Sequence, residues 1–374
     1  MAEQKIKAIV CGSTFGQFYC EALAGIPDLV EFSGILSAGS ERSKKCAERY
    51  GVKSYTSIEQ LDPDISLACV VARSGVLGGN GTKIALSLLE KGIHVIQEQP
   101  VHFKDVEICI KAAKKHNVLY RVGNLYKFLP NVRCFIACAK ALHEHSSPLY
   151  LDIGCASQVS YPLMEILSEI LPSVRPFQIL SVNGEMQPYH TVHANAGGVP
   201  LLFQVQNEVN PDDPDNFMHY LHKITMITEQ GRLCITDTLG SVHWYNKMFV
   251  PVHTGDVQML KEETASEKAL SAKGCVTIYD SGEQDFRSVF IKQWIPAIAE
   301  DIRQFVRLME NGTVSAINSC YTKTVLAARI WQQFTAELGF PILIKPTETA
   351  DTAFDAEKAM EQIRKEYEEN IYGK

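Results

Sequence analysis

The stretch KIKAIVCGSTFGQFYCEALAG, residues 5–25, decides the fold class of the first part of the chain. Its apolar run predicts a strand over residues 5–11 and then a helix over about residues 16–24. Gly12 and Gly16 lie on the turn between them. Such a turn lets the backbone approach a pyrophosphate, and the N-terminus of the helix supplies N–H donors and positive potential.

The glycine pattern of this turn departs from the GxGxxG fingerprint. Thr14 and Gln17 stand where the second and third glycines of the fingerprint would be. A tight turn that needs two glycines for its own backbone would look the same. The surrounding alternation of strands and helices favours nucleotide binding.

That alternation continues through the first 125 residues. Further strands are predicted at 32–37, 65–72, 94–97 and 119–123, and helices begin near residues 40, 82 and 104. Strands separated by helices of this length predict a doubly wound parallel sheet of the α/β class. The near-continuous apolar run at 65–72 is typical of a strand that is covered on both faces.

The second part of the chain has a different texture. Its β-rich runs at 177–184, 201–208, 222–228, 232–237 and 241–245 are separated by turn residues, which predicts an open, mostly antiparallel sheet with a few helices. Two long helices follow, at about 294–311 and 321–338, and a charged helix ends the chain at 352–372. We predict domains over 1–126 and 127–374, with the helix at about 321–338 packing back on the first domain.

Composition narrows the class of protein. A chain of 374 residues is long enough for two domains. With Lys+Arg 36 against Asp+Glu 43 the net charge is −7, so no basic excess exists for nucleic-acid binding. No apolar run approaches the roughly 18 residues of a membrane helix, and no signal-peptide core begins the chain. Eleven cysteines without a CxxC pair indicate reduced thiols and a cytoplasmic location.

The end of the second strand bears on the choice of cofactor. An NAD site usually places an acidic residue here, but Glu31 precedes the core of the strand. Ser40, Arg42 and Ser43 follow the strand instead, and hydroxyls with an arginine at a helix N-terminus suit a 2′-phosphate. Ser40 could equally be only a helix cap, with Arg42 a solvated charge. We predict NADP(H).

The ends of the later strands are expected to face the same ligand crevice as the turn at Gly12 and Gly16. Residues 72–75 lead into a glycine-rich stretch at 78–81, which either approaches the cofactor closely or forms a flexible loop. Pro100 marks a turn after the strand at 94–97, at the kind of bond where cis peptides occur. The predicted cofactor-binding residues are Gly12, Ser13, Thr14, Phe15, Gly16, Ser40, Arg42, Ser43, Ala72, Arg73, Ser74, Gln97, Glu98 and Gln99.

Two residues are candidates for proton transfer. His102 follows the turn at Pro100, and Tyr126 follows the strand at 119–123, where the first domain passes into the second. A hydrogen-bonded surface histidine and an aromatic interface residue are the alternatives. The pairs His190/His193 and His219/His222 fall in strand-like or loop-like stretches, where positions i and i+3 face opposite sides. We therefore predict no metal site.

These segments together resemble the glucose–fructose oxidoreductase/inositol dehydrogenase/MocA family, which joins a Rossmann domain to a C-terminal α/β domain. The sugar-oxidising members use the lysine of a Glu-Lys-Pro motif and a His-x-x-Asp pair in the second domain. Here Gln99 stands in place of the lysine, and the region 157–165 has no histidine. The resemblance therefore disfavours sugar or polyol dehydrogenation.

The sequence is more similar to one branch of that family, the thiazolinyl imine reductases of siderophore biosynthesis. The similar segments include VCGSTFGQFY (10–19), VARSGVLGGNG (71–81), GIHVIQEQPVH (92–102), SSPLYLDIGCASQVSYPLMEIL (146–167) and TEQGRLCITDTLGSVHW (228–244). The resemblance implies reduction of a thiazoline C=N to a thiazolidine with NADPH. It also implies a substrate held on a carrier domain of a nonribosomal peptide synthetase, and a homodimer as in many relatives.

The resemblance also implies that His102 and Tyr126 are the proton donors. Imine reduction needs a hydride on carbon and a proton on nitrogen. A histidine, with an ordinary pKa of about 6.5, can hold and release that proton, and a tyrosine, at about 10, can donate or relay it. We expect His102 to be the general acid and Tyr126 to orient the substrate or share the proton, or the reverse. A non-catalytic NADP-binding regulator is the alternative from another class.

Overall fold

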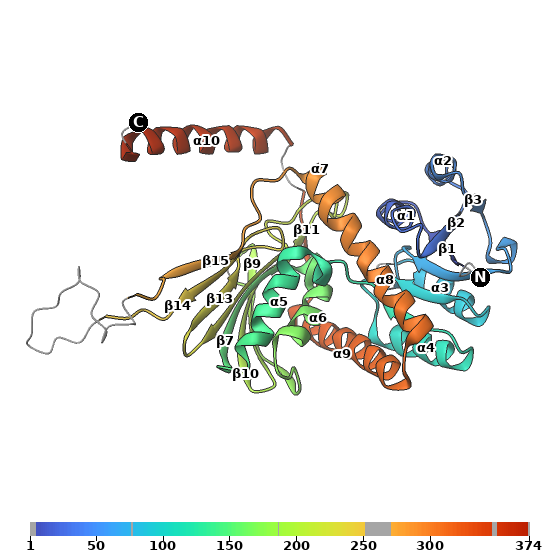
Figure 1. Cartoon of the computed structure of the whole chain (residues 1–374), viewed down its shortest axis with the longest axis horizontal. Helices are drawn as coiled ribbons and strands as arrows, with labels where there is room; N and C mark the ends of the chain where they lie inside the picture. The colour runs from blue at the N-terminus through green and yellow to red at the C-terminus, as the bar shows by residue number, and fades with distance from the viewer. Residues whose placement is uncertain (1–4, 76–77, 186, 251–270, 346–349, 373–374) are drawn as a thin grey trace, which may run out of the picture.

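The computed structural model describes residues 5–75, 78–185, 187–250, 271–345 and 350–372. Its helices and strands form two sheets with helices between and around them (Figure 1). The sheet formed by residues 6–122 is separated from the larger sheet by the helices of residues 130–142, 160–170 and 295–311 (Figure 1).

The first sheet is parallel, and its strand order is β3–β2–β1–β4–β5–β6. Its strands are β1 (Ile6–Cys11), β2 (Val30–Leu36), β3 (Lys53–Tyr55), β4 (Ile65–Val70), β5 (His94–Gln97) and β6 (Tyr120–Val122). The helices between them are α1 (Gly16–Ala24), α2 (Glu41–Tyr50), α3 (Gly81–Glu90) and α4 (Phe103–Lys115), with a 3-10 turn η1 (Ile58–Gln60). The order reverses between β1 and β4, and ligands of such sheets bind outside the carboxyl ends of the strands at this point.

The second sheet has eight strands in the order β15–β14–β13–β12–β7–β10–β9–β8. Its strands are β7 (Pro148–Ala156), β8 (Phe177–Asn183), β9 (Tyr189–Ala196), β10 (Val199–Gln206), β12 (His222–Thr228), β13 (Gly231–Ile235), β14 (Val242–Asn246) and β15 (Cys275–Tyr279). Every neighbouring pair is antiparallel except β7 with β10. The predicted fold class is thereby confirmed. A short parallel pair joins β11 (Glu208–Val209) to β16 (Ile342–Leu343).

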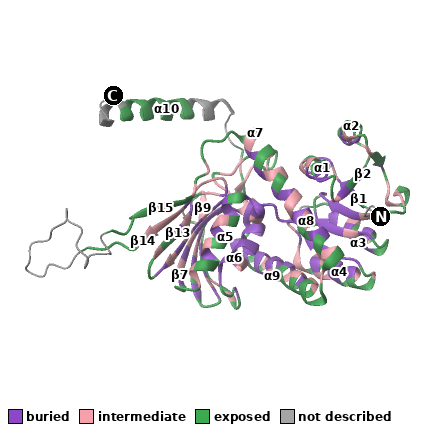
Figure 2. Cartoon of the chain, viewed as in Figure 1, coloured by how far each residue is buried: buried purple, intermediate pink, exposed green. Residues whose placement is uncertain are grey.

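Several helices of the second part lie between the two sheets (Figure 1). The helices of residues 130–338 are α5 (Pro130–Leu142), α6 (Ser160–Ile170), α7 (Phe286–Val289), α8 (Ile295–Asn311) and α9 (Val314–Leu338), with short turns η3 (Tyr126–Phe128), η4 (Ser157–Val159) and η5 (Phe290–Trp294). Helix α8 packs on α1, while α9 contacts α4, β6 and α6. Buried residues concentrate on the two sheets and on the helix faces between them (Figure 2). The boundary after residue 126 stays a prediction.

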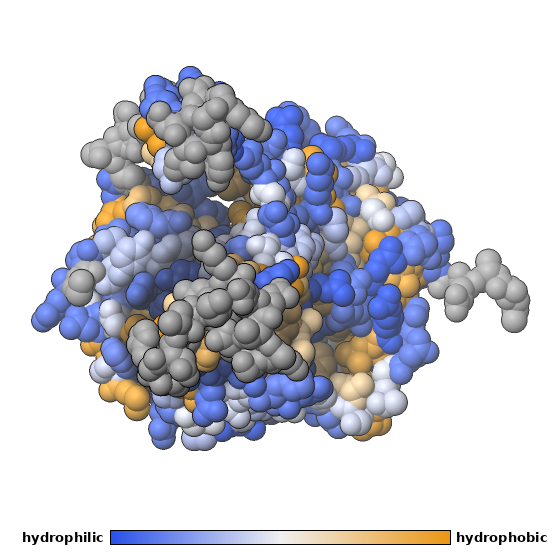
Figure 3. Space-filling view, turned by 60° about the vertical axis from the view of Figure 1, so that its left-hand side comes forward, coloured by the Kyte–Doolittle hydropathy of each residue, from blue (hydrophilic) through white to orange (hydrophobic). Residues whose placement is uncertain are grey.

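The outer face of the second sheet is open. Leu149, Leu180 and Ile278 are exposed there, and the surface in Figure 3 is mostly hydrophilic with separate apolar patches. Helix α10 (Ala350–Tyr372) is exposed over residues 356–368, and its Arg364 forms an ion pair with Glu283. Within the described residues, no helix has the length and apolar character needed to cross a membrane.

Candidate active site

The turn after β1 has the backbone that a dinucleotide site needs. Gly12 has a φ of +103°, a conformation that side chains disfavour, and an added Cβ would lie 2.8 Å from the carbonyl oxygen of Val71. No side chain caps the N-terminus of α1, which begins at Gly16. The first amides of a helix are natural donors to an anion, so the turn fits a pyrophosphate.

Arg42 lies beside this turn. Its Nη2 donates to Thr14 Oγ1 at 2.8 Å. Ser40 caps α2 by accepting from the amide of Ser43 at 3.3 Å. The Ser43 hydroxyl is buried and bonded to Ser37 Oγ and to the Ser40 carbonyl, both at 2.7 Å, so it is not free for a ligand. Arg42 is thus a cation beside the turn that forms no ion pair within the described ranges.

The glycine-rich stretch at 78–81 approaches neighbouring backbone closely. A Cβ on Gly79 would overlap the Arg73 carbonyl, and one on Gly81 the Ala72 carbonyl. Ser74 Oγ donates to the carbonyl of Pro100 at 2.5 Å, which ties this loop to the turn after β5. The glycines are therefore explained by this packing, whatever the cofactor contacts.

The turn after β5 holds three predicted residues in different surroundings. The Gln97 amide is buried, and it is bonded to Thr82 and Tyr120 at 3.3 and 2.8 Å. Glu98 accepts a hydrogen bond from Tyr19, and burial raises the pKa of Glu98 to about 8 although this bond opposes the shift. Gln99 precedes a cis bond to Pro100, and its buried Oε1 has no hydrogen-bond partner among the described residues.

His102 caps the N-terminus of α4. Its Nδ1 accepts from the amide of Lys104 at 3.3 Å, and its ring packs on Phe103 with the centroids 4.9 Å apart. This bond requires an unprotonated Nδ1 and leaves Nε2 to carry the ring hydrogen. The ring is half-buried, so Nε2 can meet a ligand.

Tyr126 is a buried residue of η3, and its ring meets aromatic residues of the second part of the chain. The ring stands edge-on to His222 and Trp294, at centroid distances of 5.2 and 6.0 Å. Burial and the nearby Glu98 raise the pKa of Tyr126 above its ordinary value, which keeps the phenol protonated. In the described part of the chain its hydroxyl has no hydrogen-bond partner.

His222 and Trp294 are site residues that the sequence analysis missed. His222 Nε2 donates to the Val159 carbonyl at 2.7 Å, its Nδ1 accepts from Thr238 at 2.8 Å, and burial lowers its pKa to about 4. Trp294 also lies 6.1 Å from the ring of Phe15, and so contacts both the dinucleotide turn and Tyr126. The alternation of β12 could have placed His222 on the buried face; the sequence carries no such signal for Trp294.

The residues around Tyr126 and the dinucleotide turn form a mostly aromatic candidate site, the proposed cleft. Its Gln99 Oε1 and Trp294 Nε1 are buried atoms without partners inside the described ranges, as expected where a cofactor or substrate supplies them. No three His, Cys, Asp or Glu side chains gather as metal ligands in those ranges. The arrangement fits a nicotinamide dinucleotide and can position a polar group of a substrate beside a neutral phenol.

Comparison with known proteins defines the class. Residues 6–124 match the oxidoreductase family with an NAD-binding Rossmann fold. Residues 146–245 match the thiazolinyl imine reductase Irp3-like C-terminal domain. The chain is thus an oxidoreductase of the Gfo/Idh/MocA family with an Irp3-like C-terminal domain, as the resemblance implied. No curated protein sequence matches it.

Solved structures share the fold at low sequence identity. A mutant 3-ketoreductase KijD10 from Actinomadura kijaniata, in complex with TDP-benzene and NADP, has a TM-score of 0.65 at 13% identity over 91% of this chain and 100% of its own. GenD2 from gentamicin A biosynthesis, in complex with NAD, has a TM-score of 0.62 at 13% identity over 90% and 95% of the two chains. UDP-N-acetylglucosamine 3-dehydrogenase GnnA from Acidithiobacillus ferrooxidans gives 0.62 and 13% over 90% and 98%.

Proposed function

We propose that this oxidoreductase reduces a thiazoline C=N bond to a thiazolidine with NADPH, on a carrier-bound intermediate of siderophore biosynthesis. The observation that carries the proposal is the match of residues 146–245 to the thiazolinyl imine reductase C-terminal domain. Gln99 supports it, because an amide cannot take the proton that oxidation of a sugar hydroxyl releases. Arg42 beside Thr14 supports NADPH, since a guanidinium suits a 2′-phosphate.

In this proposal the turn at Gly12 holds the pyrophosphate and Arg42 the 2′-phosphate. The nicotinamide, when bound, supplies the hydride. His102 acts as general acid in its imidazolium form, in which Nδ1 is also protonated and no longer accepts from the Lys104 amide; it gives the Nε2 proton to the substrate nitrogen and returns to the neutral ring. Tyr126 orients that nitrogen. The raised pKa of Tyr126 favours this division of roles. A phenol with a high pKa keeps its proton, so it can orient the substrate through a hydrogen bond but is poorly suited to transfer the proton.

The partners of the reaction are part of the proposal. The substrate reaches the cleft as a thioester on a carrier domain of a nonribosomal peptide synthetase. A homodimer forms through the outer face of the second sheet, whose eight strands offer a broad surface that bears the exposed Leu149, Leu180 and Ile278. All eleven cysteines are free, which supports a cytoplasmic location.

The test is oxidation of NADPH by the purified protein with a synthetic aryl-thiazoline thioester. We expect turnover with NADPH to exceed turnover with NADH. Loss of a general acid should lower turnover by about 10² to 10⁴, so His102→Asn, which can still cap α4, should be as impaired as His102→Ala. Tyr126→Phe should also lower turnover, because it removes the hydroxyl and keeps the ring.

Two matched variants control this experiment. His116→Ala removes a histidine at the other end of α4, and Tyr150→Phe removes a hydroxyl from β7; both should keep the wild-type rate. Full activity of His102→Asn beside an impaired His102→Ala would show that only the helix cap matters. No NADPH oxidation with any thiazoline thioester would contradict the proposed function and favour another oxidoreductase substrate.

A further inference from the structure

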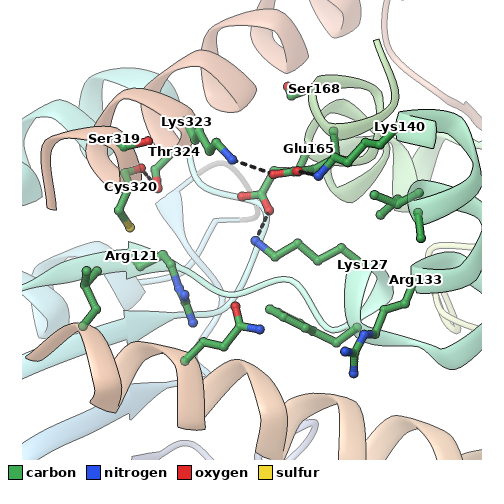
Figure 4. Close-up of a pocket in the computed structure, with 16 residues that line it drawn as sticks. Arg121, Lys127, Arg133, Lys140, Glu165, Ser168, Ser319, Cys320, Lys323 and Thr324 are labelled. Atoms are coloured by element: carbon green, nitrogen blue, oxygen red, sulfur yellow. Dashed lines mark hydrogen bonds and ion pairs between the residues drawn. The ribbon is translucent and has the colours of Figure 1, made fainter. Parts of the chain in front are cut away.

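A cavity of about 510 Å³ lies between β6, η3, α5, α6, α8 and α9 (Figure 4). None of the residues placed above around the dinucleotide turn, Tyr126 or His102 lines it. Its volume lies in the range of small-molecule sites, about 300–1,000 Å³. The function of this cavity is therefore a separate question from the reaction in the cleft.

The cavity walls carry an excess of positive charge. Five cationic side chains line the cavity against the two carboxylates Glu165 and Glu169. Asp301 lies behind the wall and pairs with one of the five, which still leaves a positive excess. This excess is local, because the whole chain has a net charge of −7. The five are Arg121, Lys127, Arg133, Lys140 and Lys323.

Arg121 contributes an unused donor. Its side chain is buried, and its Nη2 donates to the carboxylate and the backbone carbonyl of Asp301, both at 2.6 Å. Its Nε is also buried but has no hydrogen-bond partner in the described part of the chain. Buried donors in native proteins are almost always paired. Arg121 therefore brings an incompletely paired guanidinium to the cavity wall.

The other cations keep their charged ends at the cavity wall. Lys127 pairs with Glu165 and Lys323 with Glu169, each at 2.7 Å, and Lys140 also reaches Glu169. The two pairs of Glu169 have exposed lysines and are weak, so a ligand anion can compete for the ammonium groups of Lys140 and Lys323 at the rim. Arg133 is exposed and has no ion pair among the described residues. Figure 4 shows Lys127 between Arg121 and Arg133.

We propose that this cavity binds a small anion carrying two or more phosphate or carboxylate groups. Guanidinium groups recognise such oxyanions through paired N–H donors, and ammonium groups attract them as point charges. The two arginines and Lys127 provide both kinds of donor around one space, while the carboxylates limit the charge that the cavity holds when empty. The proposal does not depend on the reaction assigned to the cleft.

The test is calorimetric titration of the full chain with pyrophosphate and, separately, with citrate. Saturating NADP⁺ is present throughout to fill the dinucleotide turn. We expect one molecule per chain to bind. Ser319→Glu, which puts a negative charge on the exposed α9 side of the cavity, and Arg133→Gln should each weaken binding about tenfold or more. Binding of pyrophosphate alone identifies a phosphate site, and binding of citrate alone a carboxylate site.

Two variants outside the cavity are the controls. Gln333→Glu adds the same charge farther along α9, and Arg175→Gln removes an exposed arginine of the second part of the chain. Both should bind within about twofold of wild type, and all four variants should melt at the wild-type temperature. Absence of binding in the wild type, or equal weakening in the controls and the cavity variants, would overturn the proposal.

Discussion

The short segment of residues 124–128 separates two sites of opposite electrostatic character. On one side Tyr126 faces groups that are neutral near pH 7: burial raises the pKa of Glu98 to about 8 and lowers that of His222 to about 4. On the other side Lys127 enters a cavity of paired charges, where the Glu165 carboxylate raises the pKa of Lys127 although burial opposes the shift. Tyr126 and Lys127, which are neighbours in the same turn, therefore face a neutral and a charged environment.

The difference shows how a charged partner decides whether a partly or fully buried carboxyl is ionised. Glu98 is bonded to a tyrosine hydroxyl, so desolvation dominates and favours its neutral form. Glu165 has an ammonium group at 2.7 Å and stays paired. Asn124 connects the two sides: its Oδ1 accepts from the Tyr126 amide at 3.1 Å and its Nδ2 donates to Glu165 at 3.2 Å. The neutral site around Tyr126 suits a hydrogen-bonding phenol, and the charged cavity around Lys127 suits an anion.

Removal of the Lys127–Glu165 ion pair on the charged side should have the largest effect on stability. Lys127→Met leaves the nearly buried Glu165 carboxylate without its cation, and we expect a loss of about 3 kcal/mol in the free energy of unfolding. Urea unfolding at pH 7 measures it. Lys127→Met/Glu165→Gln should recover part of the loss because no uncompensated charge remains.

The rim of the same cavity provides the control for that measurement. Lys323 is exposed, and Glu169 keeps Lys140 as a partner when Lys323 is replaced. Lys323→Met should therefore change the free energy of unfolding by less than about 1 kcal/mol. Equal losses for Lys127→Met and Lys323→Met would mean that burial does not distinguish the two ion pairs.

Most of the fold follows from local sequence patterns. The apolar runs and glycine stops predicted α1 at 16–24, β5 at 94–97 and β12 at 222–228 with the bounds that the structure has. Strand β9 was not predicted, because YHTVHANA lacks a clear apolar alternation and owes its place to pairing with β8 and β10. Helix α9 begins at Val314, seven residues before its predicted start at residue 321, because Thr313 caps it.

The site was predictable only where it lies at strand ends. The residues after β1 and β5 were predictable because carboxyl ends of parallel strands share one edge of the sheet. The contact of Tyr126 with His222 depends on the packing of η3 against the second sheet, and no local pattern encodes it. The same holds for the cationic cavity, whose lining residues come from six separate elements.

On the neutral side, His222 should make the protein sensitive to acid. Its folded pKa of about 4 lies below its ordinary value, so an unfolded chain binds the proton first as the pH falls through 6.5. The free energy of unfolding should decrease by about 2 kcal/mol between pH 6.5 and pH 4 from this group alone. His222→Gln, which can keep both hydrogen bonds, should remove that part of the decrease, and the exposed His193→Gln should not.

Glu98 should have the opposite pH dependence, with a smaller effect because its side chain is only half-buried. Its folded pKa of about 8 lies above the ordinary value, so the folded chain keeps a proton that the unfolded chain loses between pH 4.5 and 8. The free energy of unfolding should therefore decrease as the pH rises through this window, by about 1–2 kcal/mol. Glu98→Gln should flatten this slope in urea unfolding at pH 5, 6.5 and 8, whereas Glu90→Gln, at the exposed end of α3, should leave it unchanged. A slope that persists in Glu98→Gln would place the titrating group elsewhere and remove Glu98 from the neutral side of the comparison.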